Sequence, residues 1–451
     1  MRAPISDWNP EDIHYWEHTG RRIARRNLVF SIFAEHLGFS VWLIWSVVAV
    51  NLPKAGFPFS ADQLFWLVAV PNLVGAFLRL PYTAAVARFG GRDWTVFSAA
   101  VLVIPLLLLA YCVTTPGTPY WMFLVAAATA GFGGGNFASS MANISYFYPE
   151  RHKGSALGVN AAGGNIGVAV VQVAVPVVIG VALLGDPQAP GLYLQNAALL
   201  YLVPVVLAAI CAALLMDDLP AVRARMATQL TALRSKHTWV ISVLYIGTFG
   251  SFIGYSAAFP LLISLQFTGS GASPAIAFLG PLVGSLSRPA GGWLSDRLGG
   301  ARVTAAVFLL MGLGVTGVLA SLGTGSFALF LAAFLFLFVV SGVGNGSTYR
   351  MIPAIFRAEA TRTSAGPPSE PALALARTRA AAVIGLASAV GAFGGFLIPR
   401  GLGMSISRTG SITTALLVFL AGYGMCLVLT WWFYLRTVLV SRSPSLAAAG
   451  V

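Results

Sequence analysis

LVGAFLRLPYTAAVARFGGRDWT, at residues 73–95, aligns without gaps on LVGSLSRPAGGWLSDRLGGARVT, at residues 282–304. Eight of the 23 aligned positions are identical, and Arg79 falls on Arg288. A second pair of segments follows in the same order, because AGFGGGN at 130–136 matches SGVGNGS at 341–347. A third pairs the glycines of 158–167 with those of 385–394. The repeated order predicts a duplicated chain with two equivalent halves.

The composition predicts that both halves lie in a membrane. The chain is 57% hydrophobic and only 9% charged, whereas soluble domains carry about 25% charged residues. Apolar runs reach the roughly 20 residues that a membrane-spanning helix requires. Twelve such spans are expected, six in each half, at 28–50, 62–87, 94–113, 120–146, 154–184, 191–216, 238–265, 274–295, 302–322, 326–349, 379–402 and 410–435. Parallel six-span repeats are the architecture of the major facilitator superfamily.

The net charge of +13 is explained by membrane topology, and it gives no reason to expect a nucleic-acid partner. On this helix map nearly all of the 27 Lys and Arg lie on one side, and the other side holds only Lys54, Arg400 and Arg408. Positive residues collect in cytoplasmic segments. The pattern therefore predicts a multi-pass protein of the cytoplasmic membrane with both termini in the cytoplasm.

Two arginines do not belong to either side, because Arg79 and Arg288 lie inside predicted spans. A cation inside the bilayer costs several kcal/mol and usually faces a cavity, a partner or a pathway. No acidic residue lies within one helical turn of Arg288 or within two turns before Arg79. The hypothesis is that a small anion supplies the missing charge; the alternative is an ion pair with an acid from another span.

Glycine clusters mark spans four, five, ten and eleven. Small residues allow membrane helices to pack closely, and rigid, closely packed bundles suit a carrier that rocks between states. The glycines and amides predicted to serve packing or gating are Gly133, Gly134, Gly135, Asn136, Gly163, Gly164, Gly344, Asn345 and Gly346. The loop after the eighth span, with Asp296 and Arg297, is similar to the superfamily's cytoplasmic charge motif and predicts a latch there. Two ordinary positively charged loops are the alternative.

Two longer motifs carry a more specific resemblance. AGFGGGNFASSMANISYFYPERHKGSALGVNAAGGN, at 130–165, and SGVGNGSTYRMIP, at 341–353, resemble the two signatures of the nitrate/nitrite porter family. LRLPY around Arg79, LYIGTFGSFIGYSAAFP at 244–260 and GLASAVGAFGGFLIP at 385–399 extend the resemblance over all twelve spans.

The resemblance implies a role for each matching residue. Arg79 and Arg288 would hold the anion from equivalent positions of the two halves, since guanidinium groups bind planar oxyanions in a bidentate way. Phe137 and Phe249 would sandwich nitrate or nitrite, and Tyr245 would hydrogen-bond it. Asn165 and Ser388 would be further polar contacts. Ordinary helix packing remains an alternative for both phenylalanines, and an interhelical hydrogen bond for Tyr245 and Asn165.

Glu35 and His36, in the first span, depart from the family's nitrate/nitrite exchangers, whose cavity lacks protonatable groups. A buried acid can carry a proton, because a low dielectric favours its neutral form. Nitrate import against an inside-negative potential also needs a driving ion. We therefore expect proton-coupled import, with nitrate/nitrite antiport as the alternative. A further alternative is that Glu35 pairs with Arg25 or Arg26 near the membrane surface.

The expected organisation is a cytoplasmic segment 1–27, a six-helix bundle 28–216, a linker 217–237, a second bundle 238–435 with a mobile cytoplasmic loop at 350–378, and a cytoplasmic tail 436–451. No metal-ligand cluster, catalytic constellation or cofactor motif is present in the sequence, so an enzyme is not expected. A nitrate sensor is disfavoured, because the polar segments are too short for a signalling domain. The expected partners are nitrate, nitrite, protons and the bilayer, and the family analogy favours a monomer. A carrier of another small anion remains a further alternative.

Overall fold

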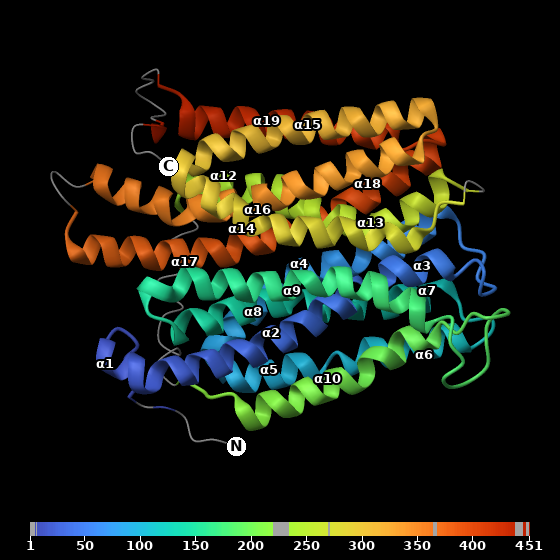
Figure 1. The fold of residues 1–451 in the computed structure, drawn as a ribbon, viewed down its shortest axis with the longest axis horizontal. Coiled ribbons are helices and arrows are strands. Elements are labelled where there is room, and N and C mark those ends of the chain that lie inside the picture. Colours follow the sequence, from blue (N-terminus) through green and yellow to red (C-terminus); the bar gives the residue numbers. More distant parts are fainter. Residues whose placement is uncertain are drawn as a thin grey trace. The chain divides into compact units, whose positions relative to one another are not determined.

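The computed structural model describes residues 5, 7–219, 234–268, 271–363, 368–437, 445–447 and 451. Parts of the predicted N-terminal segment 1–27, the linker 217–237, the loop 350–378 and the tail 436–451 lie outside these residues. The described part is helical and contains no β-strand, only one isolated bridge between Ala189 and Leu192. Figure 1 shows the course of these helices along the chain.

The chain forms two compact units. Unit 1 comprises Met1–Arg225 with Ser256–Leu282, and unit 2 comprises Met226–Tyr255 with Val283–Val451. The seventh predicted span, 238–265, therefore contributes residues to both units.

Unit 1 is built from the first half of the chain. Its elements are α1 (Ile13–Tyr15), η1 (Trp16–Gly20), α2 (Arg21–Leu43), α3 (Trp45–Asn51), α4 (Ala61–Phe89), α5 (Gly91–Ala100), α6 (Val103–Thr114), α7 (Tyr120–Ala130), α8 (Phe132–Phe147), α9 (Glu150–Val178), α10 (Gln195–Leu215), most of α13 (Ser251–Gln266) and η5 (Pro274–Phe278). Within it, α8 packs against both α2 and α4, α2 also packs on α9, and α10 packs on α5 and α6.

Unit 2 repeats the plan. Its elements are α12 (Lys236–Tyr245), the π-helical turn η4 (Ile246–Gly250), most of α14 (Leu279–Leu298), α15 (Gly300–Thr324), α16 (Phe327–Thr363), α17 (Glu370–Ala392), α18 (Gly394–Thr409), α19 (Thr413–Thr430) and η6 (Trp431–Leu435). Here α15 packs on α16 and α19, and α17 packs on α12 and α16.

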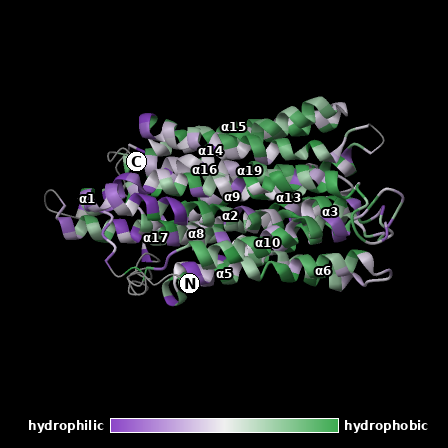
Figure 2. Cartoon of the chain, turned by 60° about the horizontal axis from the view of Figure 1, so that its bottom comes forward, coloured by the Kyte–Doolittle hydropathy of each residue, from purple (hydrophilic) through white to green (hydrophobic). Residues whose placement is uncertain are grey.

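Ten segments of the described chain are long and apolar enough to cross a membrane. Figure 2 shows the apolar residues along helices such as α6 and α13, and hydrophilic residues on α1. The two other predicted spans are helical as well. Span 120–146 is divided at Gly131 into α7 and α8, and span 274–295 becomes η5 and α14. The chain is thus a polytopic all-α membrane protein.

The connection between the tenth and eleventh predicted spans is more helical than the sequence predicts. Helix α16 continues to Thr363 and α17 begins at Glu370, so most of the expected loop 350–378 is helical where it is described. The physical reason is composition, because Ala, Arg and Glu are strong helix formers and dominate this stretch.

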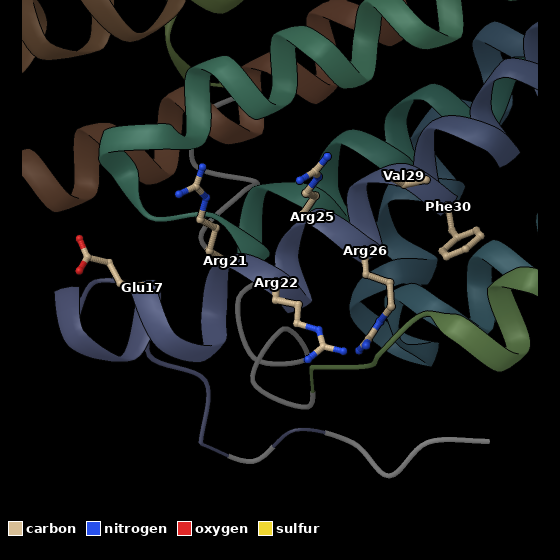
Figure 3. Close-up of a pocket in the computed structure, with 7 residues that line it drawn as sticks. All are labelled: Glu17, Arg21, Arg22, Arg25, Arg26, Val29 and Phe30. Atoms are coloured by element: carbon tan, nitrogen blue, oxygen red, sulfur yellow. The ribbon is translucent and has the colours of Figure 1, made fainter.

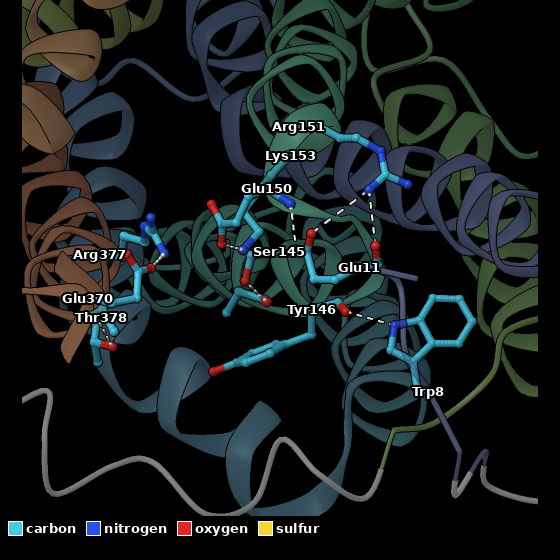
Figure 4. A network of polar contacts seen from close by, with 12 residues as sticks. Trp8, Glu11, Ser145, Tyr146, Glu150, Arg151, Lys153, Glu370, Arg377 and Thr378 are labelled. Atoms are coloured by element: carbon cyan, nitrogen blue, oxygen red, sulfur yellow. Dashed lines mark hydrogen bonds and ion pairs between the residues drawn. The ribbon is translucent and has the colours of Figure 1, made fainter. Parts of the chain in front are cut away.

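The N-terminal segment also packs onto unit 1. Trp8 Nε1 donates to the Tyr146 carbonyl at 3.0 Å, and Glu11 accepts from the Glu150 backbone N–H at 2.9 Å (Figure 4). Trp16 is buried in a small apolar cluster with Phe147. These contacts hold the turn between α8 and α9, which carries part of the first family-like motif.

Candidate functional site

Arg79 lies in the middle of α4 and is fully buried in unit 1. Its Nε donates to the carbonyl oxygen of Gly134 at 3.1 Å. Its guanidinium carbon lies 4.8 Å from the centre of the Phe137 ring and 5.4 Å from that of Trp42. Aromatic faces attract cations through their quadrupole, and more strongly when water is excluded. A backbone carbonyl and two aromatic rings thus contact the guanidinium group.

The glycines of α8 make this arrangement possible. A Cβ on Gly134 would lie 2.7 Å from Trp42 Cε2 and 2.8 Å from Gly75 Cα. Gly135 faces the ring of Tyr82, and a Cβ on Gly133 would overlap the Gly38 carbonyl. Side chains at these positions would push α8 away from α2 and α4. The helix crossing, and with it the Gly134 carbonyl beside Arg79, therefore depends on the glycine run.

Arg288 lies on α14 in unit 2 and is 7% exposed. Its Nη2 donates to the Tyr245 hydroxyl at 3.4 Å. Its guanidinium carbon lies 5.5 Å from the centre of the Tyr349 ring. Gly346, one of the predicted packing glycines, lies against the Arg288 backbone, and Gly344 lies against Thr248 and Val307. The arginine of unit 2 is thus also buried among aromatic rings on a helix held by glycines.

Phe249 is connected to Arg288 through Tyr245. The two rings stack with their centres 5.3 Å apart and an angle of 11° between their planes. Both are fully buried, and Phe249 lies on the π-helical turn η4. π-turns inside α-helices are frequent at functional sites. The turn packs on small residues, since a Cβ on Gly250 would lie 2.8 Å from the Gly394 Cα.

The other residues predicted to contact the anion are Asn165 and Ser388, and they differ in whether their polar atoms have hydrogen-bond partners. Asn165, on α9, is fully buried, and neither atom of its amide has a hydrogen-bond partner among the described residues. The same holds for Asn136 on α8. A buried amide costs free energy unless its polar atoms are hydrogen-bonded. Ser388, on α17, donates its hydroxyl to the Gly385 carbonyl at 2.8 Å. Asn345 is buried on α16.

Glu35 is buried in a polar cluster of unit 1. Its Oε2 accepts from the Asn160 amide at 2.7 Å, and the same amide donates to Ser140 Oγ at 2.6 Å. Ser31 Oγ lies 2.8 Å from Ser140 Oγ and extends the chain of contacts. Gly164 lies directly against the Glu35 carboxylate, so the carboxylate fits only beside a residue without a side chain.

Arg26 is one of the two arginines, with Arg25, that the sequence offered as an ionic partner for Glu35, and it pairs with Asp217. His36 Nδ1 lies 3.1 Å from the carbonyl oxygen of Gly163.

The charge motif predicted to form a latch lies in the last turn of α14. Asp296 pairs with Arg350, and Arg297 lies over the Trp293 ring, with its guanidinium carbon 4.1 Å from the ring centre. In unit 1, where Ala87 replaces the acid, the equivalent turn is held by Asp218. Its carboxylate accepts from the Gly91 backbone N–H at 2.9 Å. Neither Asp217 nor Asp218 was predicted from the sequence to have a role.

Trp42 and Tyr349 were also missed, although they lie over the two predicted arginines. Tyr349 stands within the second motif, SGVGNGSTYR, close to the position that Phe137 takes in the first. This similarity of position could have predicted that Tyr349 lies near Arg288. Trp42 lies in an aromatic-rich apolar run and carried no distinguishing pattern.

Among the described residues there is no group of three or more His, Cys, Asp or Glu side chains that could hold a metal ion. Each of the two units has one buried arginine among aromatic rings, on a helix that packs at glycines.

The comparisons with known proteins place this arrangement in a class of membrane carriers. The chain matches the family model "Major Facilitator Superfamily" over residues 30–398. It belongs to this superfamily and, within it, to the nitrate/nitrite porter family.

Two curated relatives support the assignment. The chain is 45% identical to the nitrate/nitrite transporter NarU of Escherichia coli, covering 96% of this chain and 97% of the relative. It is 40% identical to the probable nitrate/nitrite antiporter NarK2 of Thermus thermophilus, covering 96% of each. Among solved structures, a bacterial homolog of the human lysosomal transporter Spinster superposes with a TM-score of 0.64 at 16% identity. That match covers 91% of this chain and 96% of the other and concerns the fold alone. The relatives are transporters, and the chain is not an enzyme.

Proposed function

We propose that this protein is a secondary transporter that carries nitrate and nitrite across the cytoplasmic membrane by alternating access. The observation that carries the proposal is the pair of equivalent buried arginines, Arg79 and Arg288, each among aromatic rings. Relatives with 40–45% identity are named for nitrate and nitrite. We further propose that both termini lie in the cytoplasm, because positive residues dominate that side, and that the protein works as a monomer.

The chemistry of the two arginines suits a flat, singly charged oxyanion. A guanidinium fork donates two parallel hydrogen bonds, which match two oxygens of nitrate or nitrite. We propose that Phe137 and Phe249 form flat walls that admit trigonal or bent anions and crowd tetrahedral ones. The Tyr245 hydroxyl and the Asn165 amide would complete the anion's hydrogen bonds.

For coupling, we propose proton-driven nitrate import with Glu35 as the proton carrier. A buried carboxylate that accepts from Asn160 and lies beside Gly164 is the observation in favour. Low-dielectric surroundings favour the neutral form of an acid, so binding and release of a proton would change the charge of this cluster. Nitrate/nitrite antiport is the second candidate, and the relative named as a probable antiporter favours it.

Flux measurements in proteoliposomes distinguish the two. If transport is coupled to protons, a proton gradient directed into the vesicles (acidic outside) drives nitrate uptake even when the vesicles contain no nitrate or nitrite. Under antiport, uptake needs internal nitrite or nitrate and ignores the gradient. Glu35→Gln should abolish gradient-driven uptake and leave exchange intact, whereas Glu370→Gln, at an exposed ion pair with Arg377, should change neither. Uptake that depends only on internal anion would end the proton proposal, and absence of nitrate flux in both assays would end the transport proposal.

A further inference from the structure

A basic pocket of about 470 Å³ opens at the start of α2. Four arginines line it, together with one acid and two apolar side chains, and the lining residues are Glu17, Arg21, Arg22, Arg25, Arg26, Val29 and Phe30. The arginines stand one helical turn apart in two rows, Arg21 with Arg25 and Arg22 with Arg26. In Figure 3 the side chains of Arg22 and Arg26 point to one side of α2, and those of Arg21 and Arg25 point to the other.

The pocket has an excess of positive charge. Arg26 is tied to Asp217, and Glu17 is the one acid in the lining. The positive charges of Arg25 and Arg21 also act on the Tyr148 phenol. Burial raises the pKa of this phenol, and the two arginines oppose the rise. Like charges that line one pocket repel one another, and a bound anion reduces that repulsion. Arg21, Arg22 and Arg25 are exposed and therefore accessible to such an anion.

The apolar end of the pocket narrows the choice of anion. Val29 is 51% exposed, and Phe30 is partly exposed beside it. From here α2 continues as part of a candidate membrane span. The pocket thus has cationic groups at one end and exposed apolar side chains at the other. It lies where α2 changes from polar to apolar sequence. A soluble anion would use only the first feature, whereas a phospholipid would use both.

We propose that this pocket binds the headgroup of an anionic phospholipid. The phosphate would be bound by the guanidinium groups of Arg21 and Arg25 through charge-assisted hydrogen bonds. Arg22, in the other row, would add to the positive potential that attracts the headgroup. The acyl chain would lie along Val29 and Phe30. Because Arg26 also connects α2 to the end of α10 through Asp217, an occupied pocket would stabilise the α2–α10 side of unit 1.

The test uses the purified full-length protein and native mass spectrometry with phosphatidylglycerol, and with phosphatidylcholine of the same acyl chains. Each arginine near an anionic headgroup is expected to contribute about a fivefold factor in affinity. The variant Arg21→Gln/Arg22→Gln/Arg25→Gln should bind phosphatidylglycerol at least tenfold more weakly (a conservative order-of-magnitude estimate). Phosphatidylcholine binding should not change.

A matched control removes the same charge elsewhere. Arg88→Gln/Arg302→Gln/Arg362→Gln, all at exposed positions, should keep the wild-type preference for phosphatidylglycerol. The substitutions Arg21→Lys/Arg22→Lys/Arg25→Lys should keep most of it, and they test the pocket if the glutamine variant does not fold. Equal losses in the glutamine variant and the control, or no loss in either, would overturn the proposal. So would displacement of the lipid by millimolar inorganic phosphate, which would identify a soluble anion as the occupant.

Discussion

The arginine sites of the two units differ in what holds each guanidinium group. In unit 1, Arg79 donates to a backbone carbonyl and lies against the rings of Phe137 and Trp42. In unit 2, Arg288 donates to a phenol hydroxyl and lies over the ring of Tyr349. The sequence repeat makes the arginines equivalent, but their surroundings are not. The hydrogen bond of Arg79 goes to a backbone carbonyl, whose position the helix fixes, whereas that of Arg288 goes to a hydroxyl, which can rotate toward another partner.

The largest effect on nitrate flux is expected from replacing the two arginines, and it should differ between them. Arg79→Lys should lower nitrate flux roughly 100-fold, because an ammonium group cannot keep the bond to Gly134 and also offer a planar fork to the anion. Arg288→Lys should lower it only about tenfold, because a lysine can still reach a hydroxyl partner. Nitrate uptake into proteoliposomes at matched protein density measures both. Equal losses would show that the different surroundings have no functional consequence.

A smaller effect should follow from removing the hydroxyl partner of Arg288. Tyr245→Phe keeps the ring that stacks on Phe249 and deletes the hydrogen bond. A long hydrogen bond to a charged group contributes about 1 kcal/mol, so KM for nitrate should rise about fivefold with little change in maximal rate. Tyr349→Phe serves as the comparison, since its ring lies over Arg288 and should suffice for that contact. An unchanged KM for Tyr245→Phe would remove the hydroxyl from the binding site.

The smallest effect on transport, and a clear one on stability, is expected at the helix crossing of unit 1. Gly134→Ala would place a Cβ 2.7 Å from Trp42 Cε2, and overpacking of this kind costs about 1–3 kcal/mol. Gly158→Ala is the matched control on α9, because its Cβ would meet nothing within 4 Å. The melting temperature in detergent should fall for the first variant alone. A stable Gly134→Ala protein would mean that α8 can shift away from Trp42 at low cost.

The periodicity of apolar residues and the internal repeat together predicted a helical membrane protein with two equivalent halves and a buried arginine in each. Both features can be predicted from the sequence, because the length of an apolar run and the order of repeated residues do not depend on which helices pack together. The family-like motifs added Phe137, Phe249 and Tyr245, and the structure brings Phe137 to Arg79, Tyr245 to Arg288, and Phe249 onto the Tyr245 ring.

Only the tertiary structure decided the partners that come from other helices. Trp42 over Arg79, Asn160 on Glu35 and Asp218 at Gly91 join residues tens to more than a hundred positions apart. A helical repeat shows which face of a helix is apolar, but it does not show which neighbouring helix that face will meet. That choice depends on close packing at glycines such as Gly134 and Gly164, where the absence of one side chain sets the distance between two helices.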